Sequence, residues 1–251
     1  MLAIERRQKI MEEITREGKV YVSALSQLFH VTEETIRRDL EKLEGQDLLR
    51  RSYGGAILND HTGEDLSFQR RSSINSESKE AIAKKAMELV KDGDTIMMDS
   101  STTCLALLHQ LSSRKDLTII TNSIRLVYDF VTSPFHLIST GGNLRPNSYA
   151  LTGPVAIATL QKYFVDIAVF SCKGVTLERD VMESNEEESV VKQWMIKQAR
   201  KSILLADHSK FNRTAFIKTC DFEDITALVT DEMPNEEWQE RLAGCQVNLI
   251  A

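Results

Sequence analysis

The chain has 251 residues, of which 27% are charged and 42% hydrophobic, and its formal net charge is −6. This length allows a small module and one domain of ordinary size with a substantial core. No apolar run is long enough to cross a membrane and the N-terminus has no secretory signal pattern, so we expect a cytoplasmic protein without a membrane partner. The four cysteines have no paired spacing, which fits a reducing compartment and indicates neither a zinc site nor a catalytic thiol.

The first predicted element is an amphipathic helix over residues 4–14, because its isoleucines recur at helical spacing. Gly18 ends this helix, and residues 19–22 are β-branched enough to form a short strand. Ser23 is then expected to cap a short helix that ends at Phe29. The inward side chains of that helix are predicted to be Ala24, Leu25 and Leu28.

The next predicted helix carries the residues that point to DNA. Thr32 can cap its N-terminus. Its apolar residues recur at helical spacing and must face inward, namely Ile36, Leu40 and Leu43. Arg37 and Arg38 therefore project outward. In helix-turn-helix proteins the N-terminal part of the second helix meets base edges, and arginine is the commonest reader of guanine.

A basic β-hairpin is predicted directly after this helix, because two short apolar segments flank Arg50, Arg51 and a Gly-Gly turn. Such a wing can touch phosphates or an adjacent minor groove. Residues 1–58 are formally neutral, so clustered arginines rather than bulk charge indicate DNA binding. The candidate DNA-contacting residues are Ser23, Thr32, Glu33, Glu34, Thr35, Arg37, Arg38, Lys42, Arg50, Arg51, Tyr53 and Gly54.

This segment resembles the winged helix-turn-helix of the DeoR family of bacterial transcription regulators. The matching residues are Arg6, Ile10, Ile14, the run of residues 32–40 with its Thr-Ile-Arg-Arg-Asp-Leu end, and Gly54-Gly55-Ala56. The resemblance implies a DNA-binding regulator of transcription. Because one winged helix contacts few base pairs, we expect a homo-oligomer, a dimer or tetramer, on repeated half-sites of a double-stranded operator.

The rest of the chain is predicted to be a connection followed by an α/β domain. Residues 59–65 are polar and contain glycine, and residues 66–71 are expected to dock on one domain, so we place a linker at 59–76 between a DNA-binding domain at 1–58 and a second domain at 77–251. After a helix at about 77–91, helical patterns alternate with apolar β-rich runs. These runs lie at 95–98, 117–121, 135–139, 165–171, 202–206 and 225–230. The alternation predicts a mainly parallel sheet with helices on both faces.

Polar residues follow the predicted strands at the carboxyl edge of this sheet, where ligands gather in such folds. They form the runs Asp99-Ser100-Ser101-Thr102-Thr103, Thr121-Asn122-Ser123, Thr140-Gly141-Gly142-Asn143, Ser171-Cys172-Lys173-Gly174 and Asp207-His208-Ser209-Lys210. Each run alone has an ordinary explanation as a helix cap or a turn. Together, with two lysines and a helix N-terminus, they predict a pocket for a phosphorylated small molecule.

These runs also resemble the DeoR sensor domain, which is similar in fold to ribose-5-phosphate isomerase. The resemblance implies that Ser100, Ser101, Thr102 and Thr103 hold the phosphate. It implies a sugar pocket shaped by Asp99, Asn122, Gly141, Gly142, Lys173, Asp207 and Lys210, and it includes Glu188, whose alternative is a solvated helix charge. Ser101 stands where many relatives have glycine, and a second glycine after Gly174 is missing. The pattern also resembles that of fucose-type regulators, which would suggest a ketose 1-phosphate of a deoxyhexose.

The function predicted from the sequence is a repressor of a carbohydrate catabolic operon that a phosphorylated sugar releases from its operator. No cofactor, metal or catalytic residue is expected. The alternative is a sugar-phosphate isomerase-like enzyme, for which Asp99, Glu188 and Asp207 offer carboxylates as a general base. Further catalytic motifs of such enzymes are missing, and the DNA-binding module gives binding without turnover a purpose. An adaptor that binds no nucleic acid is the third possibility.

Overall fold

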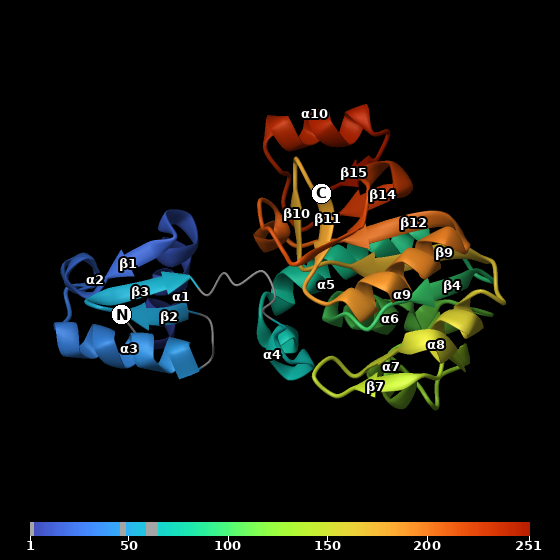
Figure 1. Cartoon of the computed structure of the whole chain (residues 1–251), viewed down its shortest axis with the longest axis horizontal. Coiled ribbons are helices and arrows are strands. Elements are labelled where there is room, and N and C mark those ends of the chain that lie inside the picture. Colours follow the sequence, from blue (N-terminus) through green and yellow to red (C-terminus); the bar gives the residue numbers. More distant parts are fainter. Residues whose placement is uncertain (1–2, 46–48, 59–64) are drawn as a thin grey trace. The chain divides into compact units, whose positions relative to one another are not determined.

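The computed structural model describes residues 3–45, 49–58 and 65–251 (Figure 1). The chain divides into two compact units, Met1–His61 and Thr62–Ala251. Among the residues described, no helix has the length and apolar character needed to span a membrane.

The N-terminal unit contains α1 (Ala3–Glu17), α2 (Val22–Phe29) and α3 (Glu33–Gly45), with β1 (Lys19–Tyr21), β2 (Leu49–Ser52) and β3 (Gly55–Leu58). The three strands form an antiparallel sheet in the order β1-β3-β2. A single core cluster of buried side chains joins the helices to the sheet, including Ile10, Ile14, Leu25, Ile36 and Leu40. The unit is therefore a winged helix-turn-helix, as predicted, and β2–β3 is its wing.

The prediction for α2 was wrong in its cap and in its inward face. The helix begins at Val22, one residue before the expected cap Ser23, and no side chain bonds at its N-cap position, which Tyr21 occupies. The buried side chains of the helix are Val22, Leu25 and Phe29. Of the predicted inward residues only Leu25 is buried, whereas Ala24 is exposed and Leu28 is 55% exposed at the edge of the buried face.

The second unit is built on a seven-stranded sheet in the order β15-β14-β12-β9-β4-β5-β6. Every neighbouring pair in this sheet is parallel. Its strands are β4 (Thr95–Met98), β5 (Thr118–Thr121), β6 (His136–Ser139), β9 (Val165–Ser171), β12 (Ala199–Leu205), β14 (Ala227–Val229) and β15 (Asn248–Ile250). The first six coincide with the predicted runs, which confirms the mainly parallel α/β fold.

Helices cover both faces of this sheet (Figure 1). From residue 76 onward, the helices of the unit are α5 (Ser76–Ala86), α6 (Thr102–Gln110), α7 (Ile124–Asp129), α8 (Gly153–Leu160), α9 (Glu186–Lys197) and α10 (Glu236–Gly244). Short 3₁₀ turns are η1 (Met87–Leu89), η2 (Leu111–Ser113), η3 (His208–Lys210) and η4 (Phe222–Asp224). Side chains alternate along β4, so Ile96 and Met98 join the core of α5 and α6 while Met97 packs with residues of α8 and α9.

Further short strands stand outside the main sheet and were not predicted. β10 (Gly174–Thr176), β11 (Asp180–Glu183) and β13 (Ile217–Cys220) form an antiparallel sheet, and β7 (Asn143–Arg145) pairs with β8 (Ala150–Thr152) in a hairpin. Each is only three or four residues long.

Part of the segment expected to be a linker is a helix, α4 (Phe68–Ser73), within the second unit. Ser67 caps it by accepting a hydrogen bond from the Arg70 amide. Phe68 is buried, and its ring lies 5.5 Å from that of Tyr149 between centroids. Burial of this aromatic side chain explains why residues 68–76 pack on the α/β unit instead of forming a free connection.

Candidate functional site: an anion pocket and a DNA-binding surface

A pocket in the second unit is lined by residues that follow three neighbouring strands of the parallel sheet. Seven of the predicted effector residues line it, namely Ser101, Thr102, Thr103, Lys173, Glu188, Asp207 and Lys210. Side chains that were not predicted complete the wall, from helices, connections and the end of β11; among them are Asp65, Arg71, Lys79, Glu183, Lys192 and Arg213.

Asp99 shapes the loop after β4 from behind the pocket wall. Its Oδ1 accepts a hydrogen bond from the Ser101 amide at 3.0 Å, and its Oδ2 accepts one from the Ser171 amide at 3.2 Å. The Ser101 hydroxyl in turn accepts from the Cys104 amide at 3.1 Å and so caps α6. This arrangement holds the positive N-terminal end of α6, with Thr102 and Thr103, at the pocket.

Lys192 on α9 was missed by the sequence analysis, although it is the most buried cation of the pocket at 5% exposure. Its Nζ donates to the Ser171 carbonyl at 2.8 Å and to the Glu183 carboxylate, and it lies 3.3 Å from Asp99 Oδ2. Burial alone would lower the pKa of Lys192, but Glu183, Asp99 and Glu188 outweigh burial and raise it. Lys192 is therefore a fixed charge that joins three elements of the site.

The loop after β12 brings Asp207 and Lys210 to the pocket. Asp207 Oδ1 accepts hydrogen bonds from the Ser209 amide and from Asn75 Nδ2, each at 3.1 Å. Burial raises the pKa of Asp207, but Lys210, the Ser209 hydroxyl and Asn75 together lower it by more, so the carboxylate is charged at neutral pH. The loop is also tied to the end of β14.

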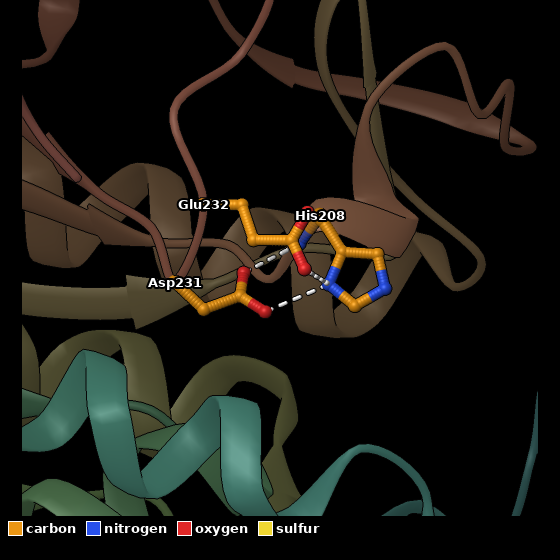
Figure 2. A group of neighbouring side chains, drawn as sticks. All are labelled: His208, Asp231 and Glu232. Atoms are coloured by element: carbon orange, nitrogen blue, oxygen red, sulfur yellow. Dashed lines mark hydrogen bonds and ion pairs between the residues drawn. The ribbon is translucent and has the colours of Figure 1, made fainter.

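That tie consists of His208 and Asp231 (Figure 2). His208 Nδ1 lies 2.7 Å from Asp231 Oδ2, and the His208 amide donates to Asp231 Oδ1 at 2.8 Å. Glu232 completes a group whose donor atoms could surround a metal ion, as do Asp180, Asp221 and Glu223 elsewhere. The carboxylates of Asp231 and Asp180 are already bonded to His208 and to Arg241 and Lys218, so we assign both groups a structural role.

Five predicted effector residues do not line the pocket: Asp99, Ser100, Asn122, Gly141 and Gly142. Asn122 is buried, and its Nδ2 donates to the Leu151 carbonyl at 3.1 Å, so it joins the end of β5 to β8. Gly142 has a φ of +117°, and a Cβ there would lie 2.4 Å from the Thr152 carbonyl oxygen. Asn122 and Gly142 thus lie against the β7–β8 hairpin beside the site, and Glu188 contacts the same hairpin through Arg145 Nε at 3.1 Å.

The charge of the wall favours an anion. Six cationic side chains line the pocket, against the acidic Asp65, Glu183, Glu188 and Asp207, although the whole chain has a net charge of −6. Lys79 is 7% exposed, and its Nζ donates to the carbonyls of Arg71 and Ile74. Burial and the nearby Lys210 lower the pKa of Lys79 to about 8. A bound anion would relieve this repulsion among cations.

In the N-terminal unit, α3 presents the predicted reading surface. The Thr32 hydroxyl accepts from the Thr35 amide at 3.3 Å, which confirms the predicted cap. Arg37 and Arg38 are exposed, each within reach of a glutamate one turn earlier on α3, at 2.6 Å and 3.3 Å. Asp39 is buried and accepts from Arg6 Nε at 2.6 Å, so the residue next to the exposed arginines fastens α3 to α1.

The wing carries Arg50 and Arg51 on β2, both of them exposed, with Tyr53 at its tip. Gly55 must be glycine, because a Cβ there would lie 2.0 Å from the Val20 carbonyl oxygen of β1. Of the predicted DNA-contacting residues, Thr35 is half-buried and the others, Ser23 included, are exposed.

Comparison with known proteins identifies a family domain in each of the two units. Residues 6–62 match the DeoR-like helix-turn-helix domain, and residues 74–232 match the DeoR C terminal sensor domain. Over 92% of the chain, it is 39% identical to the uncharacterized HTH-type transcriptional regulator YulB of Bacillus subtilis, covering 90% of that protein.

Two further relatives carry regulatory names. The chain is 33% identical, over 98% of its length and 93% of the relative, to a putative aga operon transcriptional repressor of Escherichia coli O157:H7. It is 34% identical, over 90% of its length and 91% of the relative, to the L-fucose operon activator of Haemophilus influenzae. Among solved structures, ribose 5-phosphate isomerase A of Methanocaldococcus jannaschii aligns with a TM-score of 0.43 and 20% identity, covering 55% of this chain and 56% of that one.

Two family domains in this order, together with relatives of similar length that are named as regulators, identify the fold and the general role. The chain belongs to the DeoR family of DNA-binding transcription regulators.

Proposed function

We propose that this regulator represses a carbohydrate-utilisation operon and leaves its operator when a phosphorylated sugar binds in the sensor-domain pocket. The observation that carries the proposal is the pocket itself. It combines the N-terminal end of α6 and its hydroxyl groups with an excess of cationic side chains. A phosphoryl group is the common metabolite group that uses both a helix N-terminus and lysine or arginine partners.

The remaining polar side chains of the pocket suit the hydroxyl groups of a sugar. Glu183, Glu188 and Asp207 are acceptors whose orientation is fixed by Lys192, Arg145 and Asn75. Acceptors in fixed orientations bind a ligand with correctly placed hydroxyls more tightly than a ligand that leaves these acceptors unpaired. The relatives named for the aga and L-fucose operons support a sugar pathway, and the first of them supports repression.

Binding without turnover is the favoured use of this pocket. A general base needs an oxygen within reach of the proton that it removes. Both carboxylate oxygens of Asp99 accept backbone hydrogen bonds, and Oδ1 of Asp207 accepts from Ser209 and Asn75. Burial raises the pKa of the Cys172 thiol to about 12, so this pocket residue is protonated and a poor nucleophile. Because these carboxylates are already hydrogen-bonded and the thiol is protonated, the pocket suits ligand binding by a regulator better than isomerisation.

A thermal-shift screen tests the ligand class directly. Phosphorylated sugars, with ketose 1-phosphates among them, should raise the melting temperature, because they bind the folded state. The same sugars without phosphate should not raise it at equal concentration. Stabilisation by free sugars alone would contradict the anion pocket. Conversion of a phosphorylated sugar at ordinary enzymatic rates would favour the isomerase alternative.

A further inference from the structure

The first described residues after the DNA-binding unit form one wall of the pocket. We call residues 65–79 the strap. Asp65, Leu66, Arg71, Ile74 and Lys79 of the strap all line the pocket. None of these residues follows a strand of the sheet, so the strand-end pattern of the sequence does not account for them.

The strap is held at both ends by residues around the pocket. Near its start, Arg145 Nη2 and Asn147 Nδ2 donate to the Asp65 side chain and carbonyl, each at 2.5 Å. Near its end, Asn75 Nδ2 donates to Asp207 Oδ1 at 3.1 Å. The middle of the strap is α4, and Arg71 lies on this helix.

Arg71 has two donors without a partner. Its Nε and Nη2 atoms are buried, and neither has a hydrogen-bond partner among the residues that the structure describes. The guanidinium carbon lies 5.7 Å from the centre of the Phe68 ring, and Phe68 is itself buried, so the group is held in place. Leaving a buried charged donor unpaired is costly, which makes a missing acceptor the natural explanation.

The acceptors already at the pocket are used by other groups. Glu183 is bonded to Lys192 and Ser184, and Asp65 and Glu188 share Arg145. The Nε–Nη2 edge of arginine presents two parallel donors that match two oxygens of one phosphate or carboxylate. Lys79 and Lys210 add positive charge on the same wall, so a phosphoryl group is favoured.

We infer that Arg71 binds the anionic group of the effector side-on, together with the N-terminal end of α6, and so makes the strap part of the ligand site. This inference rests on the proposed function, because it names a contact within that same pocket. The unit boundary lies between His61 and Thr62, so the strap is continuous in sequence with the DNA-binding unit. A ligand held by Arg71 would therefore act directly on the segment that leads to the winged helix.

Titration calorimetry on the full chain tests this contact, with inorganic phosphate and fructose 1-phosphate as probes. Arg71→Gln should weaken both probes by roughly tenfold to a hundredfold, which is the usual effect of losing a charge-assisted hydrogen bond. Arg70→Gln is the matched control, since it makes the same change in the same helix but does not line the pocket. Arg71→Lys keeps the charge without the paired donors and should bind with intermediate affinity.

Circular dichroism and melting curves establish whether each variant folds, and Arg71→Lys serves as the test variant if Arg71→Gln does not. Equal affinity of the wild type and the folded Arg71 variant would overturn the assignment while leaving the proposed function intact. An equal loss in Arg70→Gln would also overturn it. A wild-type chain that binds operator DNA but neither probe would contradict the anion pocket itself, and the Arg71 contact with it.

Discussion

Lys210 reaches the pocket from the loop after β12, whereas Lys201 lies exposed on that strand, away from the pocket. Lys210→Ala removes a cation from the pocket wall and should lower the affinity for a phosphorylated effector by roughly tenfold to a hundredfold. Operator affinity without effector should not change, because the substitution leaves the N-terminal unit intact. Calorimetry and DNA-binding assays on Lys210→Ala and the control Lys201→Ala measure both effects. Normal release of the operator from Lys210→Ala by effector would remove this residue from the site.

We predict that Lys79 makes effector binding depend on pH. Its pKa is lowered to about 8 by burial and by Lys210, so the ammonium loses its charge as pH rises through that value. A phosphate ester is already doubly charged above pH of about 7, so its own titration does not interfere. Effector affinity should fall by up to about tenfold for each pH unit above the pKa of Lys79. Calorimetry between pH of about 7.5 and 9.5 measures the slope.

The control for this pH effect is Lys79→Met, which should lose most of the slope. The contribution of Lys79 to folding stability changes with pH in the opposite direction to its contribution to effector affinity. Without ligand, the unfolded chain binds more protons between pH of about 8 and the ordinary lysine pKa of 10.5, so stability from Lys79 rises across that window. An unchanged slope in Lys79→Met would assign the pH effect to another group.

Replacing Arg38 tests whether the exposed face of α3 reads the bases of the operator. It is exposed on α3, and its side chain meets only Glu34 at 3.3 Å within the part of the chain that the structure describes. If Arg38 reads guanine, Arg38→Ala should cost about 1–3 kcal/mol of operator binding and relax preference at one base position. Binding to a set of single-base operator variants measures this, with the exposed Arg16→Ala on α1 as control. A uniform loss across all variants would instead indicate a phosphate contact.

At the level of elements, the wing depends on one close backbone approach. Any side chain at Gly55 meets the Val20 carbonyl at 2.0 Å, so Gly55→Ala must separate β1 from β3. We expect a loss of about 1–3 kcal/mol from the stability of the N-terminal unit, typical of overpacking. Gly244→Ala, at the end of α10 with open space around its Cβ, is the matched control. Calorimetric melting of the full chain distinguishes them, and equal stability of the two variants would refute the close contact.

The elements found from the sequence were those with a long periodic signal. The core strands of the parallel sheet are apolar runs, and α3 has a cap at Thr32 followed by Ile36 and Leu40 at helical spacing. β7, β8, β10 and β11 have at most two apolar residues each and do not stand out as apolar runs, so their pairing depends on tertiary packing. The buried face of α2 was wrong because several arcs of this short helix carry apolar residues, and only packing decides which arc is buried.

The candidate site was predictable only where strand ends define it. Residues after β4, β9 and β12 converge because parallel strands end at one edge, so Ser101, Lys173 and Lys210 were found. Arg71 and Lys192 come from helices, where a basic residue resembles an ordinary solvated charge. Their inward position follows from the packing of α4 and α9, which a local pattern does not contain.

At the level of the whole molecule, regulation requires the effector to bind one state more tightly than another. The predicted DNA-reading arginines and the proposed anion pocket lie in separate units, and the chain itself connects the two. The strap is the part of the chain that could carry the effect of ligand binding from the pocket towards the DNA-binding unit. The coupling expected of such systems is about 1–3 kcal/mol, which corresponds to a roughly 5–150-fold change in affinity.

The measurement that tests this account most directly is operator affinity with and without effector, by fluorescence anisotropy of a labelled promoter fragment at constant salt. A phosphorylated sugar that stabilises the protein in the thermal-shift screen should weaken operator binding by roughly 5–150-fold. Half of this effect should appear at the sugar phosphate concentration that half-saturates the pocket. A sugar phosphate that occupies the pocket and leaves operator affinity unchanged would contradict the account.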